Sequence, residues 1–311
     1  MTRFFTRYWL VLVIGLPVIA ALAFVSLVDD DRLSSKLEYR LHELGVRTSE
    51  SLLDTEASTV RSTLSPVRCP ATYKSIAIFG QSNASNRVQR SGDLKSLRDG
   101  KTFIYDWVTR KCYPFSEPVA GADGTTNGHS ITETVEHYRG NDPDSNLILI
   151  AFARSGSSIF RWANGNLLIR LEAVLNRLSG DGIRPDLFLW HQGEADAMPE
   201  ILAKLEADYS GSNPDLKGHY SRALQTIIGK VQDMFENVPV GVAIASLCEG
   251  TQSEQVRSAQ KEVIEQNSTV FLSSNTDELG PEYRYDGCHF KENAARLIGS
   301  DYSKLFSSIL K

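Results

Sequence analysis

The sequence predicts an α/β protein: a three-layer α/β/α domain with a mainly parallel five-stranded sheet, preceded by an N-terminal transmembrane helix. Two observations predict the domain. After Pro70, short apolar runs alternate with longer amphipathic segments, and the apolar runs are nearly continuous instead of alternating. Strands of that kind are buried on both faces, as in a parallel sheet that helices cover on each side. A third observation, an uncharged run near the N-terminus, predicts the transmembrane helix.

The N-terminal run is long enough to cross a membrane. Arg3 and Arg7 precede an uncharged stretch at residues 8–28, and three acidic residues follow it. A helix of about 20 apolar residues spans a bilayer, and basic residues on its N-terminal side place that end in the cytoplasm. The alternative is a cleaved signal peptide with a processing site near residues 21–23. In both cases the rest of the chain is expected outside the cytoplasm, in the periplasm or at the cell surface.

These features divide the chain into four segments. Residues 1–7 are expected in the cytoplasm and residues 8–28 form a signal anchor in the lipid bilayer. Residues 29–69 are predicted to be a partly helical stalk, because leucines recur there at helical spacing. Residues 70–311 form the folded domain.

The domain's elements follow from its pattern of apolar runs. Five parallel strands are expected at residues 75–79, 146–153, 185–191, 238–247 and 269–274. Helices are expected at residues 128–139, 165–179, 216–236, 252–266 and 291–310. Residues 102–115 are predicted to be a small hairpin inserted before the second parallel strand.

Composition excludes some classes of partner. The net charge is −5 and the sequence has no block rich in Lys and Arg, so binding to nucleic acid is not expected. Four cysteines in an exported chain allow three pairings. The simplest is Cys69 with Cys112 and Cys248 with Cys288. No metal site is expected, because no two cysteines have short ligand spacing and no histidine joins them.

Four of the predicted segments end a strand with unusual polar residues. They read FGQSN, FARSGSSIFRW, LWHQGEADA and YRYDGCHF. In a parallel sheet, sites form where strands end at their carboxyl edge. We therefore expect the four segments to meet in one crevice.

The residue types in these segments suit acyl transfer. A serine hydroxyl needs a base to become a nucleophile, and a histidine held by a carboxylate is the usual base. Ser82 is the candidate nucleophile, and Asp286 with His289 is the candidate pair; the alternative is that all three are turn or capping residues. The N–H groups of Ser82 and Gly156 and the amide of Gln192 are candidate oxyanion donors. Gln192 is equally suited to bonding nearby loop backbone.

Together the four segments resemble the sequence blocks of SGNH-type hydrolases, in the branch that contains sialate O-acetylesterases and plant-type carbohydrate acetylesterases. The likeness covers roughly residues 73–308 and includes the order, spacing and strand context of the blocks. It implies a flavodoxin-like SGNH fold, no cofactor, and ester hydrolysis through an acyl-enzyme. Ser82 would be the nucleophile, His289 the general base and Asp286 its orienting acid. Ser82, Gly156 and Gln192 would form the oxyanion hole.

The second block departs from the family pattern. Two glycines usually stand where this sequence has Ser155 and Gly156, and Arg154 precedes them. Arg154 indicates an acidic sugar as substrate, or else a surface salt bridge. Asn83, Glu194 and Asp196 are expected to brace the blocks or to contact substrate.

The favoured function is a membrane-tethered serine esterase that removes O-acetyl groups from a carbohydrate of the cell envelope or surface. One alternative is a glycan O-acetyltransferase that uses the same triad and takes acetyl from a membrane acyl-donor protein. A second is a catalytically silent glycan-binding module. The expected partners are therefore an acetylated carbohydrate and the lipid bilayer.

Overall fold

The computed structural model describes residues 64–311, except 98, 126 and 199–214. Its strands form one seven-stranded sheet in the order β3-β2-β4-β1-β5-β6-β7, and only the β2–β3 pair is antiparallel. The strands are β1 (Lys74–Gly80), β2 (Thr102–Asp106), β3 (Lys111–Pro114), β4 (Leu147–Ala153), β5 (Leu187–His191), β6 (Val240–Ile244) and β7 (Val270–Asn275).

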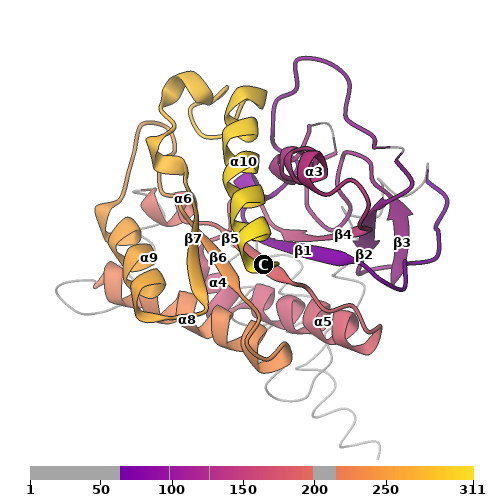
Figure 1. Cartoon of the computed structure of the whole chain (residues 1–311). Helices are drawn as coiled ribbons and strands as arrows, with labels where there is room; N and C mark the ends of the chain where they lie inside the picture. The colour runs from indigo at the N-terminus through magenta and orange to yellow at the C-terminus, as the bar shows by residue number, and fades with distance from the viewer. Residues whose placement is uncertain (1–63, 98, 126, 199–214) are drawn as a thin grey trace, which may run out of the picture.

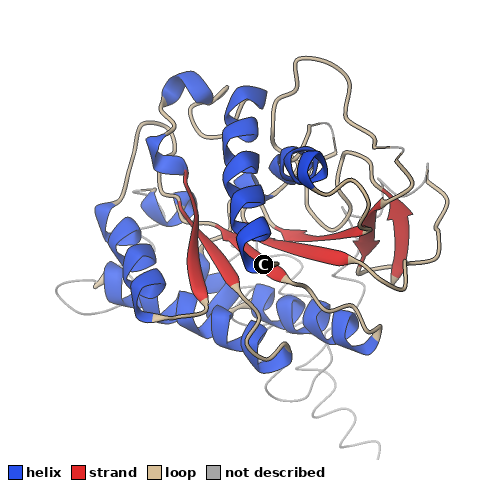
Figure 2. Cartoon of the chain, in the orientation of Figure 1, coloured by secondary structure: helices blue, strands red, loops and turns tan. Residues whose placement is uncertain are grey.

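Helices alternate with the parallel strands along the chain (Figure 2). The α-helices are α3 (Ser130–Asn141), α4 (Ile159–Asn164), α5 (Asn166–Gly180), α6 (Glu194–Ala197), α8 (Leu216–Met234), α9 (Glu254–Gln266) and α10 (Glu292–Ile309). The described residues also form three short 3-10 helices, η3 (Ser82–Ala84), η4 (Thr276–Glu278) and η5 (Pro281–Tyr283).

The five predicted parallel strands and the five predicted helices are confirmed within a few residues. The predicted strand number is wrong, because the sheet has seven strands. The hairpin expected at residues 102–115 is not separate from the sheet. Its first strand, β2, pairs in parallel with β4, and β3 then becomes the outer edge. Apolar residues such as Ile104 and Tyr105 are buried by this pairing, which explains why the hairpin joins the sheet.

Helices cover both faces of the sheet, as Figure 1 shows. One apolar core joins the sheet to α4, α5, α8 and α9, and a second core joins the opposite face to α3 and α10. All seven residues of β4 are buried, as expected for a strand with helices on both faces. This three-layer arrangement leaves the carboxyl ends of the strands free to carry a site.

The start of the described chain is attached to the outer strand of the hairpin. The N–H of Val67 donates to the Cys112 carbonyl at 2.8 Å, and Cys69 forms a disulfide with Cys112. The second disulfide joins Cys248 and Cys288, so both predicted pairings are confirmed. Disulfides are typical of a domain outside the cytoplasm.

The anchor predicted at residues 8–28 and most of the predicted stalk lie outside the described residues. Within residues 64–311, apart from the gaps given above, no helix combines the length and apolar character needed to cross a bilayer.

Candidate active site

The four polar segments meet at the carboxyl edge of the sheet. β1 lies between β4 and β5, so three of the segments follow neighbouring strands. Backbone hydrogen bonds continue past the strand ends, from Gln81 N–H to the His191 carbonyl at 3.0 Å and from Arg154 N–H to the Gly80 carbonyl at 2.9 Å. The fourth segment, the loop at residues 284–290, precedes α10 and approaches the first, where Asn83 Nδ2 donates to the Cys288 carbonyl at 3.3 Å. The predicted convergence is confirmed.

Ser82 lies in a tight turn at the end of β1. Gly80 precedes this turn with φ +143°, and a Cβ there would lie 2.0 Å from the His191 carbonyl oxygen. Only glycine permits this approach of β1 to β5. The chain then forms η3, whose first residue is Ser82, and the Ser82 residue is 3% exposed.

Asp286 holds the His289 ring directly. Asp286 Oδ2 lies 2.6 Å from His289 Nδ1, and Asp286 Oδ1 accepts the N–H groups of Cys288 at 2.9 Å and His289 at 2.7 Å. Burial raises the pKa of the Asp286 carboxyl, but these hydrogen bonds and the nearby histidine outweigh burial and lower it overall. An ionised Asp286 therefore fixes His289 with Nδ1 inward, which leaves Nε2 as the nitrogen available for proton transfer.

Ser82 and His289 are connected through the intervening Asn83 side chain. Asn83 Nδ2 donates to the Cys288 carbonyl at 3.3 Å, one residue before His289. Among the described residues, Ser82 Oγ makes no hydrogen bond with the His289 ring. Such contacts are often loose before substrate binds, so the Ser82–His289 proton transfer stays a prediction.

Two backbone N–H groups fit the expected oxyanion hole. Gly156 lies in an exposed turn after β4 with φ +64°, a conformation that glycine adopts readily. Neither the Ser82 N–H nor the Gly156 N–H donates to another group in the described part of the chain. Their role as oxyanion donors stays a prediction.

Gln192 does not fit the donor role that the sequence predicts for it. The residue is completely buried, and its Nε2 donates to Gln81 Oε1 and the Ser157 carbonyl, both at 3.1 Å, and to Asp196 Oδ2. Its Oε1 accepts from Tyr220 at 2.9 Å. Because both amide hydrogens are already used, Gln192 braces the loops instead of facing the crevice. The alternative stated for it, bonding within the loops, describes the structure better.

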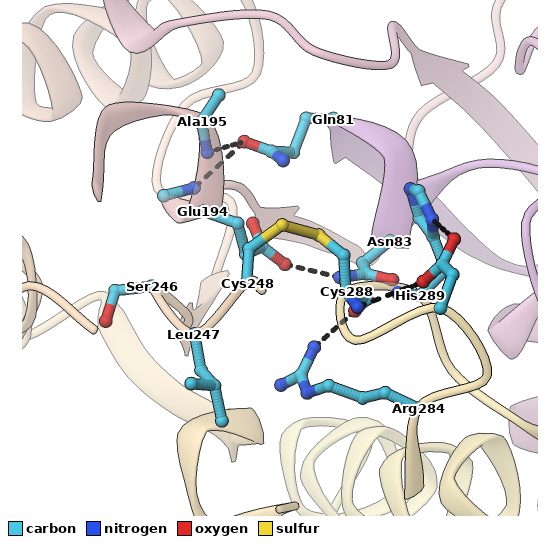
Figure 3. Close-up of a disulfide and its surroundings, with 12 residues drawn as sticks. Gln81, Asn83, Glu194, Ala195, Ser246, Leu247, Cys248, Arg284, Cys288 and His289 are labelled. Carbon is cyan, nitrogen blue, oxygen red and sulfur yellow. Dashed lines mark hydrogen bonds and ion pairs between the residues drawn. A yellow bond between two sulfur atoms is a disulfide. The ribbon is translucent and has the colours of Figure 1, made fainter. Parts of the chain in front are cut away.

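Gln81 is a structural residue of this site that the sequence reasoning missed. Its Oε1 accepts from Gln192 Nε2, from Gly193 N–H at 3.3 Å and from Ala195 N–H at 3.1 Å. Figure 3 shows this side chain reaching from the end of β1 to the start of α6. Glutamine at this position in FGQSN was the available signal, but its three partners lie more than 100 residues away along the chain.

Glu194 and Asn83 brace the site from inside. Glu194 is 1% exposed, Asn83 Nδ2 donates to its Oε1 at 2.6 Å, and His191 Nε2 lies 3.4 Å from the same oxygen. Burial raises the pKa of the Glu194 carboxyl, but His191 and Asn83 outweigh burial and lower it overall. Tyr302 OH supports His191 from α10 at 2.9 Å from Nδ1.

Asp196 joins the second segment to the third. It is completely buried, and it accepts from Ser158 Oγ at 2.6 Å and from Ile159 N–H at 2.9 Å. These contacts fix the start of α4 just beyond Gly156. Burial raises the pKa of Asp196 to about 6. Of the expected roles for Asn83, Glu194 and Asp196, the burial of all three favours bracing over substrate contact.

Arg284 is a second structural residue that was missed. It is 3% exposed, donates to the carbonyl oxygens of Cys288, Thr276 and Leu279, and lies over the Phe290 ring at 4.5 Å. The disulfide from Cys288 to Cys248 holds the same loop on its other side (Figure 3). The loop that carries His289 is therefore fixed by a guanidinium, a disulfide and Asn83.

Asp123 organises the opposite side of the crevice and was also missed. Its carboxylate accepts from Ser85 Oγ, from Ser155 N–H at 2.8 Å and from Ser155 Oγ at 3.1 Å. Asp123 is 7% exposed and lies in the loop between β3 and α3. It links the segment after Ser82 to the segment before Gly156, so Ser155, which replaces a glycine of the family pattern, has a defined structural role.

A parallel α/β sheet with a serine turn at its carboxyl edge and an Asp–His pair on the loop before the last helix is the arrangement of an α/β hydrolase-like serine esterase. Comparison with known families agrees with this class. The chain belongs to the family described as carbohydrate esterase, sialic acid-specific acetylesterase, whose profile matches residues 76–308. It is therefore a serine esterase that acts on carboxylic esters. No curated protein sequence matches the chain significantly.

Several solved structures are similar to the chain at low sequence identity. A protein from Arabidopsis thaliana has a TM-score of 0.58 at 15% identity, covering 76% of this chain and 98% of its own. A carbohydrate esterase of family 3 from Talaromyces cellulolyticus has a TM-score of 0.47 at 12% identity, covering 76% and 98%. A carbohydrate acetylesterase from Xanthomonas citri has a TM-score of 0.45 at 12% identity, covering 74% and 55%.

Proposed function

We propose that the protein removes O-acetyl groups from a carbohydrate through an acetyl-enzyme on Ser82. His289 Nε2 takes the Ser82 proton as Oγ attacks the acetyl carbonyl, and the Ser82 and Gly156 N–H groups stabilise the oxyanion. His289 then gives the proton to the departing sugar oxygen. Water, activated by His289 in the same way, releases acetate and restores Ser82.

The observation that carries this proposal is the short contact between Asp286 and His289. At 2.6 Å, the carboxylate fixes the ring orientation and stabilises the imidazolium that forms during each half-reaction. The pair lies on a loop that Asn83, Arg284 and Cys248 hold from three directions. Three contacts that hold the loop of one histidine are expected in a catalytic site. A glycan-binding module without catalysis does not require them.

Location follows from the N-terminal run and the two disulfides. We propose that residues 8–28 hold the domain at the outer side of the cytoplasmic membrane, close to envelope or surface glycans. The protein should then stay with membranes through alkaline washing and enter solution only with detergent. Release by washing alone would contradict the anchor and favour a cleaved signal peptide.

The test of the activity is acetate release by the full chain in detergent micelles. With 4-nitrophenyl acetate and with an O-acetylated sugar, release should be lost in Ser82→Ala, and the intact protein should transiently gain the mass of one acetyl group. Release that persists in Ser82→Ala would exclude the acetyl-enzyme. Acetyl transfer to a glycan hydroxyl in place of release would support the transferase alternative.

A further inference from the structure

Tyr285 lies against the ring of the proposed general base. The Tyr285 and His289 rings are stacked, with centroids 5.9 Å apart and an angle of 28° between their planes. The backbone sets up this contact, because the Tyr285 N–H donates to the His289 carbonyl at 3.0 Å and the next pair outward, Arg284 and Phe290, forms an antiparallel bridge. Tyr285 and His289 are therefore directly opposite each other on the two sides of one loop, where facing side chains interact.

Two contacts restrict the His289 ring in different directions. Asp286 Oδ2 lies 2.6 Å from Nδ1 at the edge of the ring, which limits rotation of the ring about its own Cβ–Cγ bond. Tyr285 lies against the face of the ring, which limits the swing of the whole side chain about Cα–Cβ. The His289 side chain is 23% exposed and that of Asp286 is 40% exposed, so the protein core does not enclose this pair. The stacked ring therefore supplies a restraint that the core does not.

The aromatic ring of Tyr285, and not its hydroxyl, is the part suited to this role. Burial and then the negative charge of Asp286 raise the pKa of Tyr285 from its usual value of about 10. The phenol therefore stays neutral at neutral pH and does not accept a proton there. An aromatic face within about 6 Å attracts a cation, and the ring of His289 lies at that distance.

We propose that Tyr285 is a positioning residue for the general base. Its ring holds His289 in the orientation that takes the Ser82 proton, and it stabilises the imidazolium that exists until the proton passes to the departing sugar oxygen. This inference rests on the proposed esterase function and adds a residue outside the Ser-His-Asp triad to it.

The first experiment observes the His289 ring without catalysis. The full chain, labelled with ¹³C-histidine, is studied by NMR in detergent micelles, and His289→Gln identifies the signal of His289 by its loss. A stacked aromatic ring shifts the signals of nearby protons, so Tyr285→Phe should keep the position of the His289 signal and Tyr285→Leu should move it. A His289 signal that Tyr285→Leu leaves in place would overturn the proposal.

Kinetics provide the second readout. With 4-nitrophenyl acetate, Tyr285→Leu should lower kcat about fivefold and change KM less than about twofold, which corresponds to the loss of one aromatic pair. Tyr285→Phe should keep most of the activity, because it retains the ring. Tyr285→Gln is a second variant without the ring and should behave as Tyr285→Leu does. Equal losses in the Phe and Leu variants would overturn the role of the ring.

A double variant tests whether Tyr285 acts through His289. In His289→Ala, the residual rate should not fall further when Tyr285→Leu is added, because the group that Tyr285 positions is already absent. A further fivefold fall in the double variant would show an effect that does not pass through His289, and it would overturn the proposal.

Tyr73→Leu is the matched control. Tyr73 is also partly buried, but it directly precedes β1, at the edge of the sheet opposite Ser82, where its hydroxyl donates to the Gly182 carbonyl at 3.0 Å. The substitution removes a tyrosine ring and a hydrogen bond, so it should lower the free energy of unfolding in urea and leave kcat unchanged. A fall in kcat equal to that of Tyr285→Leu would show a general effect of lost packing and would overturn the proposal.

The outcomes separate this inference from the esterase function. Ser82-dependent acetate release with the same kcat in Tyr285→Leu would contradict only the role of Tyr285. No release from the unsubstituted protein would contradict the esterase, and the NMR signal of His289 would then still show whether Tyr285 holds that ring.

Discussion

Asn83 Nδ2 donates to Glu194 Oε1 at 2.6 Å, and both side chains are almost completely buried. The same nitrogen also donates to the Cys288 carbonyl at 3.3 Å (Figure 3). One amide group thereby links the turn of Ser82 to the end of β5 and to the loop of His289. Asn83 therefore helps to set the distance between Ser82 and His289, the proposed nucleophile and base.

Replacing Asn83 by Asp should strongly destabilise the protein. A second carboxylate would meet buried Glu194 in place of a donor, and breaking such a pair costs about 3 kcal/mol. Asn83→Ala should cost less, about 1–2 kcal/mol, because it leaves an unsatisfied acceptor but adds no charge. Urea unfolding of both variants measures the difference.

The control for this pair is Asn141→Asp at the exposed end of α3. It makes the same chemical change on the surface, so the free energy of unfolding should move by about 0.5 kcal/mol or less. An equal loss in the buried and exposed variants would mean that the contact with Glu194 contributes nothing specific.

The two disulfides should contribute equally to the free energy of unfolding, but only one of them should affect kcat. Their sequence separations, 43 for Cys69–Cys112 and 40 for Cys248–Cys288, are similar. Loop-closure entropy predicts a loss of about 4 kcal/mol for replacing either pair by alanines. Only Cys288 adjoins His289, so only the Cys248→Ala/Cys288→Ala protein should lose kcat under conditions where both remain folded.

Each disulfide variant is thus the control for the other. Acetate release from 4-nitrophenyl acetate, measured alongside unfolding by urea, separates the two effects. Equal kcat in both folded variants would contradict the view that the Cys248 tether positions the His289 loop.

Asp196 should make the protein less stable as pH rises from 4 to 7. Its folded pKa is about 6, raised by burial, whereas an unfolded Asp has a pKa of about 3.9. Between these values the folded state binds more protons than the unfolded state, so the free energy of unfolding falls with rising pH. The full loss, reached above pH 6, is about 3 kcal/mol and is absent below pH 4.

Asp196→Asn isolates this effect from other titrating groups. The amide has the same shape and can still accept from Ile159 N–H while donating to Ser158. The unsubstituted protein should lose about 3 kcal/mol relative to this variant between pH 4 and pH 7 in urea unfolding. Parallel curves for the two proteins would show that Asp196 does not titrate in this range.

Asp286→Asn should reduce kcat by about 100-fold or more, because the amide favours the wrong tautomer of His289. His289→Ala should cost at least as much, and the double variant should be no worse than His289→Ala alone, since Asp286 acts through the ring. Steady-state hydrolysis of 4-nitrophenyl acetate measures all three. Additive losses would indicate that Asp286 has a role independent of His289.

Much of the fold could be predicted because its signals are local. The continuous apolar run of β4 and the leucine spacing of α5 each depend only on neighbouring residues. The hairpin was harder, because its strands can pair with each other alone or join β4, and only burial against the rest of the sheet decides between these. Among site residues, Asp286 and His289 are three positions apart, so their pairing follows from one turn.

The sequence by itself determined which chemical groups are present, their order, and the strands whose ends bring them together. The tertiary structure alone decided how donors and acceptors are shared among them. Gln192 donates inward to the Gln81 oxygen, which also accepts from two backbone N–H groups. Asp123 joins Ser85 to Ser155 although the three residues come from different loops. A hydrogen bond between distant segments depends on three-dimensional distance, and no local pattern of residues encodes that distance.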